Sequence, residues 1–166
     1  MIRIAVITVS DSAAGGTRDD LSGPAVAARC EKAGWRVTHR EVVPDDQLRI
    51  ARLLVALAAT GDYDVVLTTG GTGIAARDVT PEATRDVIER EIPGLAEVMR
   101  AEGRKSTPRA SLSRGVAGSR GQTLVINLPG SPKGAVESLE AVSDLLVHIV
   151  DLLHGRTAHG NAARRN

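Results

Sequence analysis

The sequence predicts an α/β protein, with a three-layer α/β/α arrangement around a mostly parallel central sheet. Four short apolar runs, bounded by polar turns, alternate with segments that have helical periodicity. The clearest runs are apolar throughout, which is typical of strands covered on both faces. The length of 166 residues, with 42% hydrophobic and 25% charged residues, suits one domain with a full-sized core.

The first predicted element is a strand at residues 2–9, which is rich in β-branched residues and nearly all apolar. A polar loop follows at residues 10–21. Ser22 is a candidate helix N-cap because Pro24 lies in the first turn behind it. We expect this helix to end near Gly34, since glycine favours helix C-termini.

The second strand is predicted at residues 35–43, where apolar and polar residues alternate. Apolar residues then recur three and four positions apart over residues 50–58, which predicts a helix with one buried face. Gly61 ends this helix. Residues 64–69 form a third buried strand that runs directly into a glycine-rich loop.

The remaining elements follow the same alternation. Thr80 is a candidate N-cap for the next helix, and a further helix includes residues 95–99. Residues 103–121 are rich in Gly, Ser and Arg and are interpreted as a long loop with short ordered pieces, a kind of segment that is often functional. Residues 123–128 form a fourth buried strand, and residues 136–153 form the last helix.

The composition argues against several classes of function. A net charge of +1 gives no field that would attract nucleic acid or a membrane. The only aromatic residues, Trp35 and Tyr63, offer few platforms for base stacking. The single cysteine, Cys30, is expected to be a buried apolar residue. Without a signal peptide or an apolar stretch of ~20 residues, we expect a cytoplasmic protein with one domain at residues 1–155 and a flexible tail at residues 156–166.

Polar loops follow the carboxyl ends of the predicted strands. In open α/β sheets, ligands bind at this edge. We therefore expect the loops to converge on one crevice, and the sequence places the following candidates in them: Ser10, Asp11, Ser12, Asp45, Gly70, Gly71, Thr72, Gly73, Asp78, Pro129, Gly130 and Ser131.

The glycine-rich loop, Gly70 to Gly73, is the richest of these features. Bare backbone N–H groups and threonine hydroxyls can hold phosphate oxygens. The loop is neither a Walker A sequence nor a dinucleotide fingerprint. A tight strand-to-helix turn would need the same glycines, so the loop by itself favours neither interpretation.

Two carboxylates could bring a metal ion to that phosphate. Asp78 lies five residues beyond the glycine loop, and Asp45 follows the second strand. Mg²⁺ prefers one or two carboxylates together with phosphate oxygens. Alternatively, Asp78 caps a helix or pairs with Arg77, and Asp45 is part of an ordinary turn.

The other candidates also have two interpretations. The residues at positions 10–12 offer two hydroxyls and a carboxylate, or they simply form a turn. The turn from Pro129 to Ser131 precedes a helix N-terminus that could bind an anion or could only be capped. Five basic residues could pair with a phosphate or a pterin-like ligand, or be solvated: Arg104, Lys105, Arg109, Arg114 and Arg120. The histidines show no metal-ligand spacing.

Taken together, the sequence resembles the molybdopterin adenylyltransferases of molybdenum cofactor synthesis, of the Mog type, from about residue 3 to residue 153. The resemblance rests on strings that occur in the family's order: AVITVSD at 5–11, SGP at 22–24, VPD at 43–45, TGGTG at 69–73, RDVTPEAT at 77–84, LSR at 112–114 and NLPGSP at 127–132.

The resemblance implies a three-layer α/β/α fold, commonly a homotrimer, that adenylylates molybdopterin with Mg-ATP and releases pyrophosphate. The product passes to a molybdate-inserting partner. By motif, Asp78 and Asp45 would be the catalytic acids and the Mg²⁺ ligands. Nucleotide binding would fall to Ser10, Asp11, Ser12, Gly70, Gly71, Thr72 and Gly73, and molybdopterin binding to Ser113, Arg114, Pro129, Gly130 and Ser131.

One departure and two alternatives accompany the resemblance. Gly103 stands where some relatives carry a serine near the pterin, so one contact is expected to be missing. Related proteins of the MoaB type share the scaffold, and some would bind the pterin without turnover. A hydrolase of a nucleotide or of pyrophosphate is the other alternative. The string from Arg77 to Pro81 follows the Mog type and favours an active enzyme.

Overall fold

The computed structural model describes residues 1–156 and confirms the α/β prediction. The predicted tail lies outside the described residues from residue 157 onward. In chain order the elements are β1 (Arg3–Val9), α1 (Asp11–Ala14), α2 (Ser22–Lys32), β2 (Arg36–Val43), α3 (Gln47–Thr60), β3 (Val65–Thr69), α4 (Thr80–Arg85), β4 (Arg90–Glu91), α5 (Pro93–Ser106), the 3₁₀ helix η1 (Pro108–Leu112), β5 (Ala117–Arg120), β6 (Thr123–Leu128) and α6 (Pro132–Leu153).

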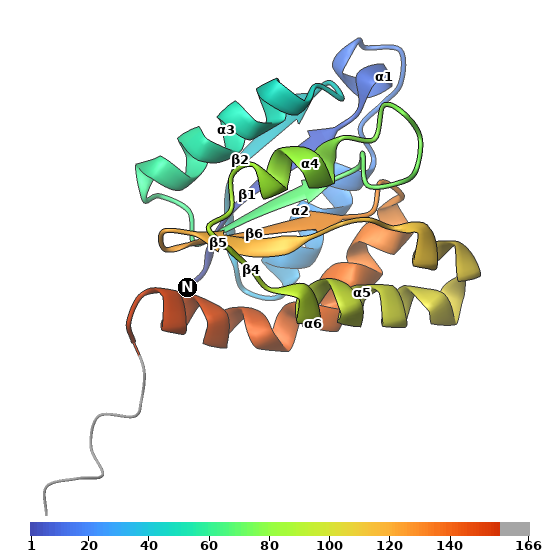
Figure 1. Ribbon diagram of the computed structural model, residues 1–166. Helices are drawn as coiled ribbons and strands as arrows, with labels where there is room; N and C mark the ends of the chain where they lie inside the picture. Colours follow the sequence, from blue (N-terminus) through green and yellow to red (C-terminus); the bar gives the residue numbers. More distant parts are fainter. Residues whose placement is uncertain (157–166) are drawn as a thin grey trace, which may run out of the picture.

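One sheet runs through the molecule in the order β2-β1-β3-β6-β5-β4. The first four strands in this order pair in parallel, whereas β5 pairs antiparallel with both β6 and β4. Helices α3 and α4 cover one face, and α2, α5 and α6 cover the other, which gives three layers (Figure 1). The prediction of a mostly parallel sheet in a three-layer fold is thus confirmed.

Two apolar clusters fill the space between the layers. One joins alternate residues of β1 and β3, such as Val6 and Leu67, to Leu139 and Leu146 of the long helix α6. The other joins the opposite faces of the same strands to Ile50 of α3 and neighbouring residues. Because the strands are buried on both faces, their sequences are mostly apolar.

The structure differs from the predicted elements in the long segment 103–121. Helix α5 continues to Ser106, η1 follows, and β5 adds an antiparallel strand, so the segment is mostly ordered rather than a loop. The polar loop after β1 also contains the four-residue helix α1. Neither predicted N-cap acts as one. Ser22 and Thr80 are the first residues of α2 and α4, and at α2 the carboxylate of Asp20 accepts the N–H of Gly23 instead, at 2.9 Å.

Candidate functional site

The carboxyl ends of the four parallel strands meet at one edge of the sheet, as predicted. Val9 at the end of β1 lies opposite Val43 of β2, and Thr69 at the end of β3 pairs with Leu128 of β6. The loops that carry most of the predicted site residues all leave from this edge (Figure 1). Parallel register therefore brings together residues that are as far apart in the sequence as Ser10 and Ser131.

The first two glycines of the loop after β3 cannot be replaced without strain. Gly70 has φ +101°, and a Cβ atom there would lie 2.2 Å from the carbonyl oxygen of Val9. Gly71 has φ +65°, and its Cβ atom would lie 2.3 Å from Thr80 Oγ1 and 2.9 Å from Asp45 Oδ1. Both positive φ and close approach require glycine at these positions.

The loop is fixed through the N–H group of Gly70 and through its carbonyl groups, of which those of Thr72 and Gly73 accept hydrogen bonds from Arg114. Gly70 donates its N–H to the carbonyl oxygen of Leu128 at 3.2 Å, and Thr80 donates its hydroxyl to Gly70 O and its N–H to Gly71 O. Among residues 1–156, no protein acceptor takes the N–H groups of Gly71, Thr72 or Gly73. Three neighbouring donors therefore remain available for an anion such as a phosphate.

Asp45 and Asp11 hold each other through reciprocal hydrogen bonds. The N–H of Asp11 donates to Asp45 Oδ2 at 2.9 Å, and the N–H of Asp45 donates to Asp11 Oδ1 at 3.0 Å. Arg77 donates to both carboxylate oxygens of Asp11, each at 2.9 Å. Asp11 thus serves to orient Asp45. Its predicted contact with the nucleotide stays a prediction.

Asp78 lies against Gly73, at the far end of the glycine loop. Its Oδ2 atom accepts the N–H of Ala75 at 2.9 Å, and it would lie 2.7 Å from a Cβ atom at Gly73. Burial raises the pKa of Asp45, and the negative charges of Asp11 and Asp78 raise it further, against the N–H of Asp11 and the charge of Arg77. The Asp45 and Asp78 carboxylates thus repel each other, and a bound cation would relieve that repulsion.

Two cavities open at this edge and share a wall. The first has a volume of about 500 Å³, and its lining includes Ser10, Asp45 and Gly70. The second has a volume of about 580 Å³, and its lining includes Thr72, Gly73, Ser113 and Pro129. Four residues line both cavities: Gly71, Asp78, Gly130 and Ser131.

Side chains fix the turn that follows β6. Thr69 donates its hydroxyl to the carbonyl oxygen of Pro129 at 2.6 Å. Ser131 is the N-cap of α6, and its hydroxyl accepts the N–H of Gly134 at 3.1 Å. The positive end of the longest helix is therefore directed at the wall between the two cavities.

Three predicted site residues are not in the lining of either cavity. They are Asp11, Ser12 and Arg114. The hydroxyl of Ser12 lies 3.2 Å from that of Ser10. The guanidinium group of Arg114 contacts the carbonyl groups of Gly73 and Asp78 and the carboxylate of Glu82.

Helix α5 and η1 contribute a wall to the second cavity that includes Met99, Arg100, Thr107 and Arg109. The sequence predicts only Arg109 of these four as a possible ligand-binding residue. It does not reveal the others because the apolar pattern around Met99 continues into a polar, glycine-containing stretch that is interpreted as a loop.

The glycine at residue 103 has a steric reason. Gly103 lies where α5 packs against η1, and a Cβ atom at this position would be 2.7 Å from Ala110 Cβ. A serine would have to displace η1.

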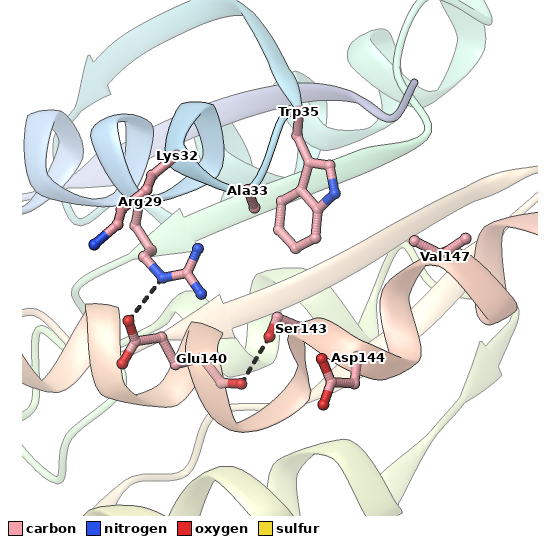
Figure 2. A pocket seen from close by; sticks show the side chains of 8 residues that line it. All are labelled: Arg29, Lys32, Ala33, Trp35, Glu140, Ser143, Asp144 and Val147. Carbon is pink, nitrogen blue, oxygen red and sulfur yellow. Dashed lines mark hydrogen bonds and ion pairs between the residues drawn. The ribbon is translucent and has the colours of Figure 1, made fainter.

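A further hollow of about 490 Å³ lies between α2 and α6, in the layer of helices that also contains α5. Trp35 lies beside it, and Arg29 Nε donates to Glu140 Oε1 at 2.7 Å across it (Figure 2). Its lining contains none of the predicted site residues. The chemistry suggested by the sequence therefore belongs to the sheet edge.

Residues 1–156 contain no group of three or more His, Cys, Asp and Glu side chains that could hold a metal ion. Two carboxylates completed by phosphate oxygens would suit Mg²⁺ without such a group. Within the same residues, no helix is long and apolar enough to cross a bilayer.

The chain is similar to known proteins in both sequence and structure. A family model described as a probable molybdopterin binding domain matches residues 5–148. The molybdopterin adenylyltransferase of Helicobacter pylori strain J99 is 42% identical over 156 residues, which are 93% of this chain and 89% of that protein. The Escherichia coli K12 molybdopterin adenylyltransferase is 41% identical, over 93% of this chain and 79% of that protein. A crystal structure of the Thermus thermophilus molybdopterin biosynthesis enzyme MoaB is 50% identical, with a TM-score of 0.88 over 93% of this chain and 98% of that one.

Proposed function

The chain belongs to the molybdopterin-binding domain family, and on that premise we propose that it is a molybdopterin adenylyltransferase. It transfers the adenylyl group of ATP to molybdopterin in molybdenum cofactor biosynthesis. The observation that carries the proposal is the pair of cavities with a common wall, since a transfer between two substrates requires both to be held with their reacting groups in contact. Asp78 lies in that common wall.

The first cavity binds ATP. Asp45 and Asp78 both line it, so the triphosphate lies where two carboxylates can share a cation with phosphate oxygens. These two side chains would hold Mg²⁺, which would neutralise charge on the phosphates. Ser10 and Gly70 line the same cavity and contact the nucleotide. Asp11 supports Asp45 from behind, at the distances given above.

The second cavity binds molybdopterin. Its lining combines the apolar Met99 with polar groups such as Ser113, as expected for a site that encloses a flat heterocycle. The N–H groups of Gly71, Thr72 and Gly73 hold the terminal phosphate of molybdopterin beside the common wall, together with the N-terminus of α6. Of the four loop residues predicted to bind the nucleotide, Gly70 to Gly73, only Gly70 and Gly71 keep that role in this arrangement.

The transfer itself needs no protein nucleophile. An oxygen of the molybdopterin phosphate attacks the α-phosphorus of ATP, a new P–O–P bond forms, and the bond to the β-phosphate breaks to release pyrophosphate. The protein contributes by aligning the two phosphates and by stabilising the charge on them. We further propose that residues 1–155 form one domain and that the protein is a cytoplasmic homotrimer. It delivers its product to a molybdate-inserting enzyme.

The direct test is to incubate the protein with molybdopterin and Mg-ATP and to measure adenylylated molybdopterin and pyrophosphate. Asp78→Asn keeps an oxygen for the N–H of Ala75, so we expect a folded protein with at least a roughly 100-fold lower rate. Asp62→Asn is a matched control, because Asp62 is exposed at the opposite edge of the sheet.

Three results would contradict the proposal. Molybdopterin binding without turnover would indicate a MoaB-like binding protein. Phosphate release from a nucleotide without molybdopterin would indicate a hydrolase. Full activity of Asp78→Asn would remove Asp78 from the mechanism.

A further inference from the structure

Arg114 lies beside the pterin-side wall but is not part of the lining of the second cavity. It follows Ser113, which lines that cavity, and its own N–H donates to the carbonyl oxygen of Thr72 at 2.8 Å. Its Nε atom donates to the carbonyl oxygen of Gly73, and its Nη2 atom to that of Asp78, both at 2.7 Å. One guanidinium group thus binds both ends of the segment 73–78.

Apart from the ion pair between Arg77 and Asp11, few other contacts fix that segment. Residues 74–77 are exposed, with Ile74 at 71%, and an internal hydrogen bond closes them into a turn between Ala75 and Asp78. The orientation of the Asp78 carboxylate therefore depends on how the two ends of the turn are anchored. Arg114 supplies an anchor at each end.

Glu82 holds Arg114 in this position. Its carboxylate receives hydrogen bonds from Nη1 and Nη2 of Arg114, and Glu82 belongs to the first turn of α4. The hydrogen bond from Arg114 holds the pKa of Glu82 below its ordinary value, so the pair is charged at neutral pH. A guanidinium group committed to two carbonyl groups and a carboxylate is poorly placed to bind a substrate as well.

We propose that Arg114 is a positioning residue that holds Asp78 and the glycine loop in the geometry needed for transfer, and that it does not bind molybdopterin. The proposal rests on the adenylyl transfer proposed above and assigns this motif residue a different task. It also makes Arg114 a link between the two cavities, because its backbone follows the pterin-side Ser113 while its side chain holds the residue that faces the nucleotide.

The test compares Arg114→Lys with Arg120→Lys. A lysine ammonium group cannot form the planar fork that joins two carbonyl groups to a carboxylate. Arg120 also donates to a carbonyl oxygen, that of Val87 at 2.9 Å, but it lines neither cavity, so this control should behave as wild type. For Arg114→Lys we expect kcat to fall on the order of 10- to 100-fold, with an unchanged equilibrium Kd for molybdopterin.

Hydrogen exchange provides a readout that does not depend on turnover. Amides in residues 73–78 should exchange faster in Arg114→Lys than in wild type, and not in Arg120→Lys. Glu82→Gln leaves Arg114 in place but weakens its anchor. It should therefore also lower kcat and speed exchange in residues 73–78, both to a smaller extent than Arg114→Lys. This variant carries the test if Arg114→Lys does not fold.

Two outcomes would overturn the proposal: a weaker molybdopterin Kd with unchanged kcat in Arg114→Lys, which would make Arg114 a ligand, or unchanged exchange in residues 73–78. If the wild type forms no adenylylated product, the proposed function fails, while the exchange and binding experiments still decide whether Arg114 holds the Asp78 turn or contacts the pterin.

Discussion

Replacing Gly71 with alanine should damage the site in a way that replacing Gly61 does not. Both glycines have similar positive φ, +65° and +72°, so alanine carries the same backbone strain at either position. Nothing lies within 4 Å of a Cβ atom at Gly61, whereas a Cβ atom at Gly71 meets Thr80 Oγ1 and Asp45 Oδ1. The pair of variants therefore separates backbone strain from the effect of the two oxygen atoms.

The magnitudes follow from these contacts. The strain of a left-handed alanine costs roughly 1–2 kcal/mol, which is the whole effect expected for Gly61→Ala. At Gly71 the added atom also displaces the Thr80 hydroxyl from Gly70 O, and an unsatisfied buried hydroxyl costs about 1–3 kcal/mol more. Gly71→Ala should further weaken Mg-ATP binding, because the Asp45 carboxylate must move.

The assays are urea denaturation for the free energy of unfolding and calorimetric titration with Mg-ATP. Gly61→Ala should bind Mg-ATP as wild type does, and Gly71→Ala should lose both more stability and more affinity. If the two variants are equally stable and Gly71→Ala binds Mg-ATP normally, then Gly71 does not lie against Asp45 in the way described here.

Three other predictions concern stability and reactivity. Hydrogen bonds from Arg3 outweigh the effect of burial and hold the pKa of Asp64 below its ordinary value, so the stability they contribute is present above pH ~4 and is lost as pH falls through the lowered pKa. Asp64→Asn should therefore cost ~1–3 kcal/mol at pH 7 in urea denaturation, and little near pH 2. Burial raises the pKa of Cys30 to about 12, so a thiol reagent should label the unfolded chain but not the native protein. Gly103→Ser should lower the free energy of unfolding by about 1–3 kcal/mol, and Ala110→Gly in the same chain should restore most of it.

The sequence was sufficient to predict the central strands because their environment fixes their composition. β1, β3 and β6 are covered on both faces, and burial on both faces requires apolar residues at most positions of a strand. β5 was missed for the opposite reason. It contains Gly118, where a Cβ atom would lie 2.5 Å from the carbonyl oxygen of Arg90, so the close pairing with β4 demands a residue that is typical of loops.

The edge that carries the site could also be predicted, because parallel strands place their carboxyl ends together. The sequence could not tell which polar side chains turn into the cavities and which bind other loops. Asp11 is paired with Arg77, 66 residues away, and Arg114 with the carbonyl group of Gly73, 41 residues away. Such pairings depend on the packing of loops that are distant in the chain, and no local pattern records them.

The same packing explains why the glycine loop after β3 and the turn after β6, each weak evidence for a site by itself, form one site. A Cβ atom at Gly130 would lie 3.3 Å from the Cα atom of Gly70, so the turn after β6 rests directly on the glycine loop after β3. A larger residue at position 130 would push the two apart. With glycine there, the N-terminus of α6 and the N–H groups from Gly71 to Gly73 face the same wall, and each is a weak anion site by itself. Acting together beside a wall that also carries Asp78, they can hold the molybdopterin phosphate against the ATP in the neighbouring cavity, which neither element could do alone.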